Sequence, residues 1–119
     1  MENDLCNIEL ARLAKEKGFD IAVDNFFING KSQSDIIFLQ YKCDSCFIWQ
    51  PTLYLLSKWL REKHNIHVVS DCNHSGWFWE ICKTNGTTIK QMILSENQRY
   101  CISYEEAFKI GLYKALLYI

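Results

Sequence analysis

The chain has 119 residues, which is the length of one ordinary globular domain. Hydrophobic residues make up 49% of it and charged residues 23%, a balance that excludes intrinsic disorder as the main state. Lys and Arg total 13 against 14 Asp and Glu, so the formal charge is −1 and no sequence-wide basic field exists to attract nucleic acid.

The sequence predicts a soluble, cytoplasmic protein with no membrane partner. Residues 1–4 are acidic and polar, whereas a secretory signal needs a positive start followed by an apolar run. The longest apolar stretches, such as 36–39, are far shorter than the roughly 18 residues that a membrane helix requires. Because no export signal is recognised, the six cysteines are interpreted as reduced thiols rather than as a disulfide framework.

Nothing in the composition divides the chain into two domains. It has no low-complexity tract, internal repeat or long Gly/Ser linker, and its single proline is Pro51. We therefore expect one domain over residues 1–119, with the change of character at 42–51 as the only plausible seam. The first predicted element is a helix over 3–17, which Gly18 ends.

Two extended segments follow the first helix. Residues 25–28 and 35–41 flank the turn-rich stretch 29–34, which predicts a hairpin with a loose loop. The sequence leaves open whether this hairpin joins the main sheet or folds over the second face of that sheet.

The second half of the chain begins with a predicted helix over 51–64. Pro51 suits the first helical position, because its missing N–H would have no partner there. Asn65 tolerates the left-handed conformation that ends a helix. A strand over 66–72 is expected to follow.

A tight hairpin is predicted next, with strands at 77–83 and 88–94. Asn85-Gly86 is the dipeptide that tolerates the two positive φ angles of a two-residue turn. Such a turn makes these pairs face each other: Trp79 with Met92 and Trp77 with Leu94 on one surface, Phe78 with Ile93 and Cys82 with Ile89 on the other. Both surfaces would carry apolar area, so the one without helices needs the N-terminal segment or another chain to cover it.

The last predicted element is an amphipathic helix that starts at a capping box, with Ser103 as the cap and Glu106 three residues later. Its main apolar stripe contains small residues that permit a close approach to a sheet. A second apolar line, off that stripe, consists of Ile110, Tyr113 and Leu117. Together the elements predict an α+β domain in which helices pack on an antiparallel sheet, in the order helix, hairpin, helix, three strands, helix.

One pattern in the chain resembles a metal motif. Cys43 and Cys46 form a CxxC pair that could hold one tetrahedral zinc, and Cys72 and His74 could complete the site. A single CxxC with scattered partners is weak support for zinc, and two ordinary reduced thiols are the favoured interpretation. A thioredoxin-like role fits poorly, since the pair does not stand at a helix start.

No catalytic motif is recognised. His64, His67 and His74 could in principle serve a cysteine as a base, but no short motif places any of them beside a thiol. The chain also lacks a Gly-rich phosphate loop, HExxH and GxSxG. The prediction is a protein that is not an enzyme and carries no cofactor.

Residues 51–119 share their predicted order of elements with double-stranded-RNA-binding domains. Those domains grip phosphates with lysines at the start of the last helix, where this chain has Glu105 and Glu106. Nucleic acid could still bind by base stacking on the aromatic residues of the hairpin. Few cations are available there to hold the phosphates: Lys83, Lys90 and Arg99. Weak nucleic-acid binding through this half stays an alternative, and an aromatic core is favoured.

Several segments in combination resemble a family of small uncharacterised proteins encoded by phages, prophages and mobile elements of Bacteroides-type gut bacteria. They are Gly18-Phe19-Asp20, Pro51-Thr52, Trp59-Leu60-Arg61-Glu62-Lys63-His64-Asn65-Ile66-His67, Ser103-Tyr104-Glu105-Glu106-Ala107, Gly111-Leu112 and Ala115-Leu116. The resemblance implies no activity, cofactor or site residue. It implies that the CxxC pair is particular to this chain, which weakens the zinc interpretation further.

The leading prediction is therefore a non-enzymatic, phage-like accessory protein that acts as an interaction module, with an unidentified protein or a second copy as its partner. The surplus apolar surface on the hairpin and the last helix is the reason. The residues predicted to form the interface are Ile110, Tyr113, Leu117, Phe78 and Ile93.

Overall fold

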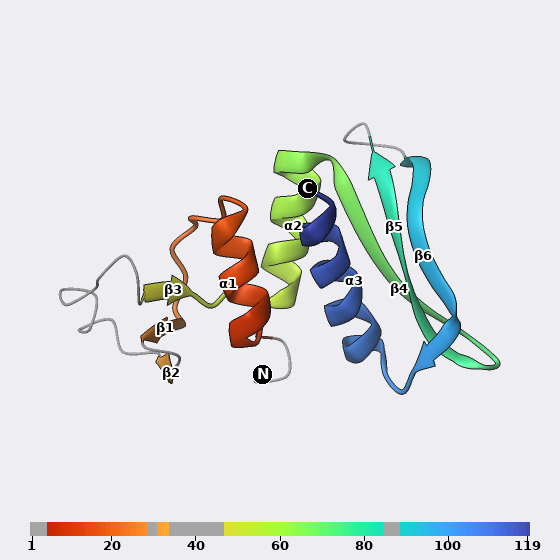
Figure 1. Cartoon of the computed structure of the whole chain (residues 1–119), viewed down its shortest axis with the longest axis horizontal. Helices are drawn as coiled ribbons and strands as arrows, with labels where there is room; N and C mark the ends of the chain where they lie inside the picture. The colour runs from red at the N-terminus through yellow and green to blue at the C-terminus, as the bar shows by residue number, and fades with distance from the viewer. Residues whose placement is uncertain (1–4, 29–30, 34–46, 85–88) are drawn as a thin grey trace.

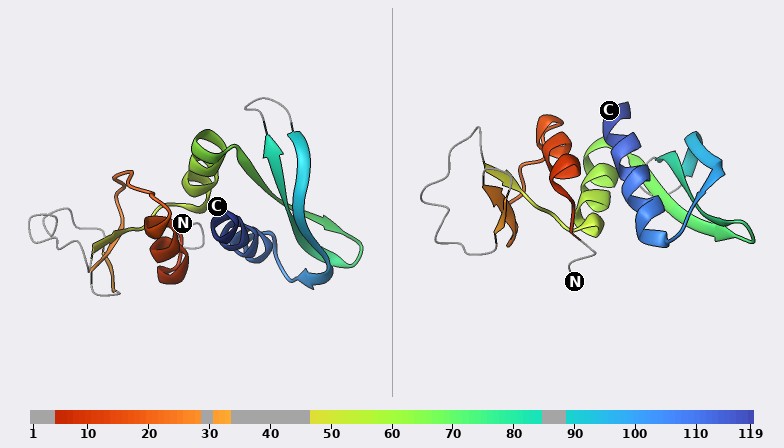
Figure 2. Two further views of the ribbon diagram at one scale, coloured as in Figure 1. Left: turned by 45° about the horizontal axis from the view of Figure 1, so that its top comes forward. Right: turned by 60° about the horizontal axis from the view of Figure 1, so that its bottom comes forward.

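A computed structural model describes residues 5–28, 31–33, 47–84 and 89–119 (Figure 1). It is a mixed α/β globule in which a layer of three helices lies between two antiparallel sheets (Figure 2). The elements are α1 (Ile8–Glu16), β1 (Phe26–Ile28), β2 (Lys31–Gln33), β3 (Phe47–Trp49), α2 (Leu53–His64), β4 (Ile66–Asn73), β5 (Gly76–Thr84), β6 (Ile89–Cys101) and α3 (Tyr104–Tyr118). The predicted class, helices packed on antiparallel sheet, is confirmed.

The larger sheet has the order β4-β5-β6, and α3 packs on one of its faces. Small residues make this packing close, as the sequence predicts. A Cβ atom at Gly111 would lie 2.8 Å from Cγ1 of Val68 and 3.1 Å from Cβ of Trp79. Glycine is therefore required where the helix backbone touches the sheet.

Helix α2 forms between two local signals that the sequence carries. The Thr52 hydroxyl accepts the Leu55 N–H at 3.0 Å, which caps the first turn. Asn65 adopts the left-handed conformation with φ of 56° and ends the helix, as predicted. Because β4 begins at the next residue, α2 and β4 diverge from this tight turn (Figure 1).

Helix α1 is shorter than the predicted 3–17 because Asn7 caps it. The Asn7 side chain accepts the Leu10 N–H at 2.8 Å, so the helix begins at Ile8. Gly18 has a φ of +102° and ends the helix region as predicted. Before the cap, Cys6 N–H donates to the Pro51 carbonyl at 3.0 Å, which ties this end of the chain to the start of α2.

The hairpin predicted in the first half is wrong in its strand pairing. β1 matches the expected 25–28, but it pairs with β2 and β3 instead of with 35–41. The segment 35–41 lies outside the described residues. Strand β3 comes from within the seam expected at 42–51, where no strand was predicted, because three residues are too few for a periodic pattern.

The small sheet β2-β1-β3 also takes neither of the two places considered for it. It lies across the helix layer from the main sheet, against α1 (Figure 2). The Lys15 ammonium donates to the Phe47 carbonyl at 2.7 Å, and the Gln50 side chain donates to the Cys6 carbonyl at 2.9 Å. As a result the helices are packed on both sides, and the described residues before α2 pack on the helix layer instead of on the outer face of the main sheet.

The register predicted for the 77–94 hairpin is wrong. Thr84 pairs with Ile89, so four residues connect β5 and β6 where a two-residue turn was expected. Three register shifts then displace the pairs further, because β6 carries extra residues relative to β5. The observed partners are Trp77 with Cys101, Trp79 with Glu96, Ile81 with Leu94 and Cys82 with Met92.

One apolar core joins the three helices to both sheets. Leu56, Leu60, Leu112 and Leu116 are fully buried in the helix layer, and Ile81 closes the core from the main sheet. Such burial contributes roughly 1.5–3 kcal/mol for each large side chain. In the described part of the chain, no helix is long and apolar enough to cross a membrane.

Candidate functional site

A row of large apolar side chains lies in solvent along α3. Ile110 is 36% exposed, Tyr113 40% and Leu117 50%. Their spacing of three and four residues places them on one side of the helix. We call this row the α3 ridge.

The opposite side of α3 shows why the ridge is free. The residues there that touch the sheet and the other helices are fully buried, among them Ala107, Gly111 and Ala115. They have small side chains, so α3 sits low on the sheet, while the larger Leu112 and Leu116 are fully buried in the helix layer. The helix is therefore held firmly by one side while the ridge makes no contribution to the core.

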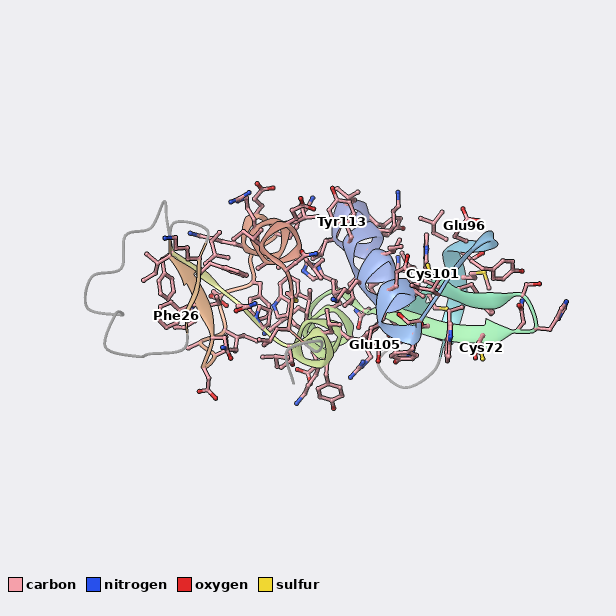
Figure 3. The ribbon with its side chains drawn as sticks, turned by 90° about the horizontal axis from the view of Figure 1, so that it is seen from below. Phe26, Cys72, Glu96, Cys101, Glu105 and Tyr113 are labelled. Atoms are coloured by element: carbon pink, nitrogen blue, oxygen red, sulfur yellow. The ribbon has the colours of Figure 1, made fainter. Side chains whose placement is uncertain are left out.

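Two grooves flank the ridge, and Ile110 lines both. The first, of about 210 Å³, lies between α1 and α3, and Leu10 and Tyr113 form part of it. The second, of about 360 Å³, lies between α3 and β6, with Trp79 in its wall. Figure 3 shows Tyr113 on α3 and Glu96 on the neighbouring β6, which carries the far wall of the second groove.

Charged side chains stand at equal spacing on either side of Ile110. Glu106 precedes it by four residues and Lys114 follows it by four, and both line the groove toward β6. The Glu106 carboxylate also accepts the Ile102 N–H at 3.2 Å. The backbone N–H of Glu106 donates to the Ser103 hydroxyl at 3.1 Å. The predicted capping box thus exists, with the glutamate bonded to the residue before the cap. This symmetric arrangement of charge was not recognised in the sequence, although the spacing of four was visible there.

Of the residues predicted for the interface, the four whose side chains are described lie on two surfaces. Ile110, Tyr113 and Leu117 lie together on the α3 ridge. Trp77 and Trp79 face the helices, so Phe78 between them points to the outer face of the sheet, where its ring meets Tyr100 at 6.5 Å. Ile93 falls at a register shift in β6 and does not pair with Phe78; its side chain lies outside the described set.

The predicted zinc ligands are described only in part. Cys72 and His74 are both exposed, at the far end of β4 and in the turn after it. Cys43 and Cys46 lie outside the described residues, and the chain resumes at Phe47 in the small sheet. Figure 3 shows Cys72 in the main sheet and Phe26, the stacking partner of Phe47, at the opposite end of the molecule. Among the described residues, no group of three His, Cys, Asp or Glu side chains could hold a metal ion.

Three of the described thiols, Cys6, Cys82 and Cys101, have a raised pKa. Burial raises the pKa of the Cys6 thiol to about 12, so it stays protonated at neutral pH. Desolvation also raises the pKa of Cys82 and of Cys101, with nearby Glu80 and Glu106 acting in the same direction. None of these three has the low pKa of a nucleophilic cysteine. Cys72 is exposed on β4.

Two of the hairpin aromatics, Trp77 and Trp79, pack toward the helices, whereas Phe78 and the exposed Tyr100 meet on the outer face of the sheet. Trp79 is 5% exposed and packs beneath α3, and half-buried Trp77 meets the Tyr104 ring at 5.8 Å. A buried ring has no free face on which a base could stack. Glu105 and Glu106 stand exposed at the start of α3, where they repel phosphate.

Compared with protein-family models, curated proteins and solved structures, the chain matches none. The geometry of the chain itself is therefore the basis for a function.

Proposed function

We propose that this protein is a non-enzymatic interaction module that pairs with a second copy of itself through the α3 ridge. The observation that carries the proposal is the position of Ile110, exposed between two grooves with Glu106 and Lys114 four residues to either side. An apolar patch with an acidic residue at one end and a basic residue at the other suits an interface between two identical chains.

The spacing of the charges favours an antiparallel pair of α3 helices. Four helical residues span about 6 Å along the axis. If a two-fold axis passes beside Ile110, then Glu106 comes near the partner's Lys114, and Lys114 comes near the partner's Glu106. The two Ile110 side chains meet at the centre, so every group in the row has a complementary neighbour. A parallel arrangement would instead bring like charges together.

The ridge also has the composition of an interface. A single exposed apolar residue is ordinary on a protein surface, but a continuous row along one helix is not. Tyr113 adds a large, stiff side chain that loses little conformational entropy when it is buried. The resemblance to small phage and mobile-element proteins and the expected cytoplasmic location are part of this proposal.

Native mass spectrometry and light scattering over a range of concentrations test the pairing. The wild-type chain should form a dimer, and Ile110→Glu should shift it to monomer because the substitution places two carboxylates at the two-fold axis. Ile21→Glu is the matched control, since Ile21 is 38% exposed in the loop after α1 and far from the ridge. A wild-type chain that stays monomeric at high concentration would refute the proposal.

Charge reversal tests the antiparallel geometry. Lys114 is exposed, and Lys114→Glu should weaken the dimer, because the introduced carboxylate would then face the partner's Glu106. Mixing this variant with Glu106→Lys should restore pairing between unlike chains. Failure of the mixture, with both variants folded by circular dichroism, would exclude this arrangement. The same mass spectra would reveal bound zinc if Cys43 and Cys46 hold the metal with Cys72 and His74.

A further inference from the structure

A second cavity, separate from the ridge, opens where α2 and β4 diverge. Its volume is about 570 Å³, in the range of sites for small ligands. α2 forms one wall, β4 the other, and the first turns of α3 close the third side; Figure 3 shows Glu105 on this side of α3, toward α2. No residue that lines this cavity lines either groove of the ridge. The residues that matter below are Ser57, Arg61, His67, Val69, Tyr104 and Phe108.

Arg61 brings an unpaired positive charge to this cavity. Its side chain is half-buried, and one guanidinium nitrogen donates to the Ser57 hydroxyl at 3.1 Å, which holds the group in place. Within the described ranges, no carboxylate lies at ion-pair distance from it. A guanidinium has five N–H donors in a planar fork, so most of them remain available for a ligand.

His67 adds a second group without a partner. Its Nδ1 atom is buried and makes no hydrogen bond with any described residue. Desolvation, and then the nearby Arg61 charge, lower the pKa of His67, so the imidazole is neutral at pH 7. Buried polar atoms in proteins are nearly always paired, with protein or with a bound molecule. The Nδ1 atom has no accessible surface, and the His67 side chain lies on the face of β4 opposite Val68, which packs on α3. The polar group that can reach a ligand in this cavity is therefore Arg61, which keeps free N–H donors beyond its bond to Ser57.

The rest of the wall is aromatic and apolar. The rings of Tyr104 and Phe108 lie 5.6 Å apart at a tilt of 44°. The Ser70 hydroxyl donates to the Tyr104 carbonyl at 2.9 Å, which fixes this wall to β4. Val69 supplies a further apolar surface. Such a wall accommodates a flat ring rather than a sugar or a phosphate chain.

We infer that this cavity binds a small aromatic monoanion, with its carboxylate on Arg61 and its ring against Tyr104 and Phe108. The planar carboxylate matches the fork of the guanidinium, which the Ser57 hydroxyl holds in place. Glu105 lines the same cavity and disfavours a more highly charged ligand such as a nucleotide.

Isothermal titration with 1-naphthoate and with its neutral isostere 1-naphthamide tests the inference. The wild type should bind naphthoate about ten- to a hundredfold more tightly than the amide, because only the anion forms charge-assisted bonds with Arg61. Arg61→Gln should remove this preference. Lys58→Gln is the matched control, since Lys58 is an exposed cation on the same helix that pairs with Glu62 at 3.9 Å outside the cavity.

Other outcomes would overturn the inference. Equal affinity for the two probes, no binding of either, or a preference that survives in folded Arg61→Gln would each exclude an anion site at Arg61. Should that variant fail to fold, Arg61→Lys should still weaken naphthoate binding by several fold while leaving the amide unchanged, because an ammonium lacks the planar fork of the guanidinium. Ile110→Glu should bind naphthoate like the wild type, which separates this site from the dimer.

Discussion

The two sides of α3 both contain apolar residues and have opposite roles. On the sheet side, Gly111 and its small neighbours are fully buried and let the helix backbone touch Val68 and Trp79. On the other side, Tyr113 and Leu117 are large and remain in solvent. Small residues on a helix thus indicate where the fold is held, and large exposed ones indicate where it is free to bind.

The largest expected effect separates two leucines on these sides. Leu112→Ala should lower the free energy of unfolding by about 2–5 kcal/mol, because Leu112 is fully buried and the substitution leaves a cavity. Leu117→Ala should change it by less than about 0.5 kcal/mol, since that side chain is half in solvent. Urea unfolding, at protein concentrations low enough to keep the chain monomeric, measures both. If both substitutions lowered the free energy of unfolding equally, the ridge would belong to the core.

A smaller effect is expected at the closest contact between α3 and the sheet. Alanine favours a helix over glycine by about 1 kcal/mol. At Gly111 the added Cβ would lie 2.8 Å from Cγ1 of Val68, a buried β-branched residue that cannot easily move. We expect Gly111→Ala to destabilise the protein by a net amount of about 1–3 kcal/mol. A thermal melt that shows stabilisation would mean that the helix is free to lift from the sheet.

The smallest expected effect concerns His67, the second residue of β4, whose Nδ1 atom is buried. Its pKa is lowered from the ordinary 6.5 in the folded state. As the pH falls through about 6.5, His67 becomes protonated in the unfolded chain but stays neutral in the folded chain. The free energy of unfolding therefore decreases toward acid pH and recovers above about 6.5.

Urea unfolding of the wild type and His67→Gln between pH 5 and 8 measures this dependence. The variant should lose part of the acid sensitivity and match the wild-type slope near pH 8. The charged group that acts on the imidazole is Arg61 from α2, and Cys82 is the pairing partner of His67 on β5. Identical slopes at all pH values would mean that His67 is accessible to water.

Features encoded by a few neighbouring residues could be predicted. Asn65 ends α2 in the left-handed conformation and Ser103 caps α3, and each depends only on residues within one helical turn. The apolar period of α3 likewise predicted its buried stripe. Of the candidate interface, the sequence brought Ile110, Tyr113 and Leu117 together because they share one helix.

Features that depend on distant segments could not be predicted. Phe78 and Ile93 were expected to face each other, but the longer connection and the register shifts of β6 separated them. The pairing of β1 with β3 joins residues that are far apart in the chain, across an undescribed stretch. The cavity at Arg61 needs three elements at once, and no local pattern contains all of them.

The sequence by itself determined the class of the fold, the end of α2 at Asn65, the start of α3 after Ser103 and the apolar row on α3. These follow from backbone preferences and side-chain period, which act over a few residues. The predicted start of α2 at Pro51 was wrong, because Thr52 caps the helix and Leu53 begins it. Only the tertiary structure decided where the small sheet lies, which face of α3 stays open and which polar groups meet beside His67. Those outcomes depend on how whole elements fill space against one another, since the core closes only when all of them are packed.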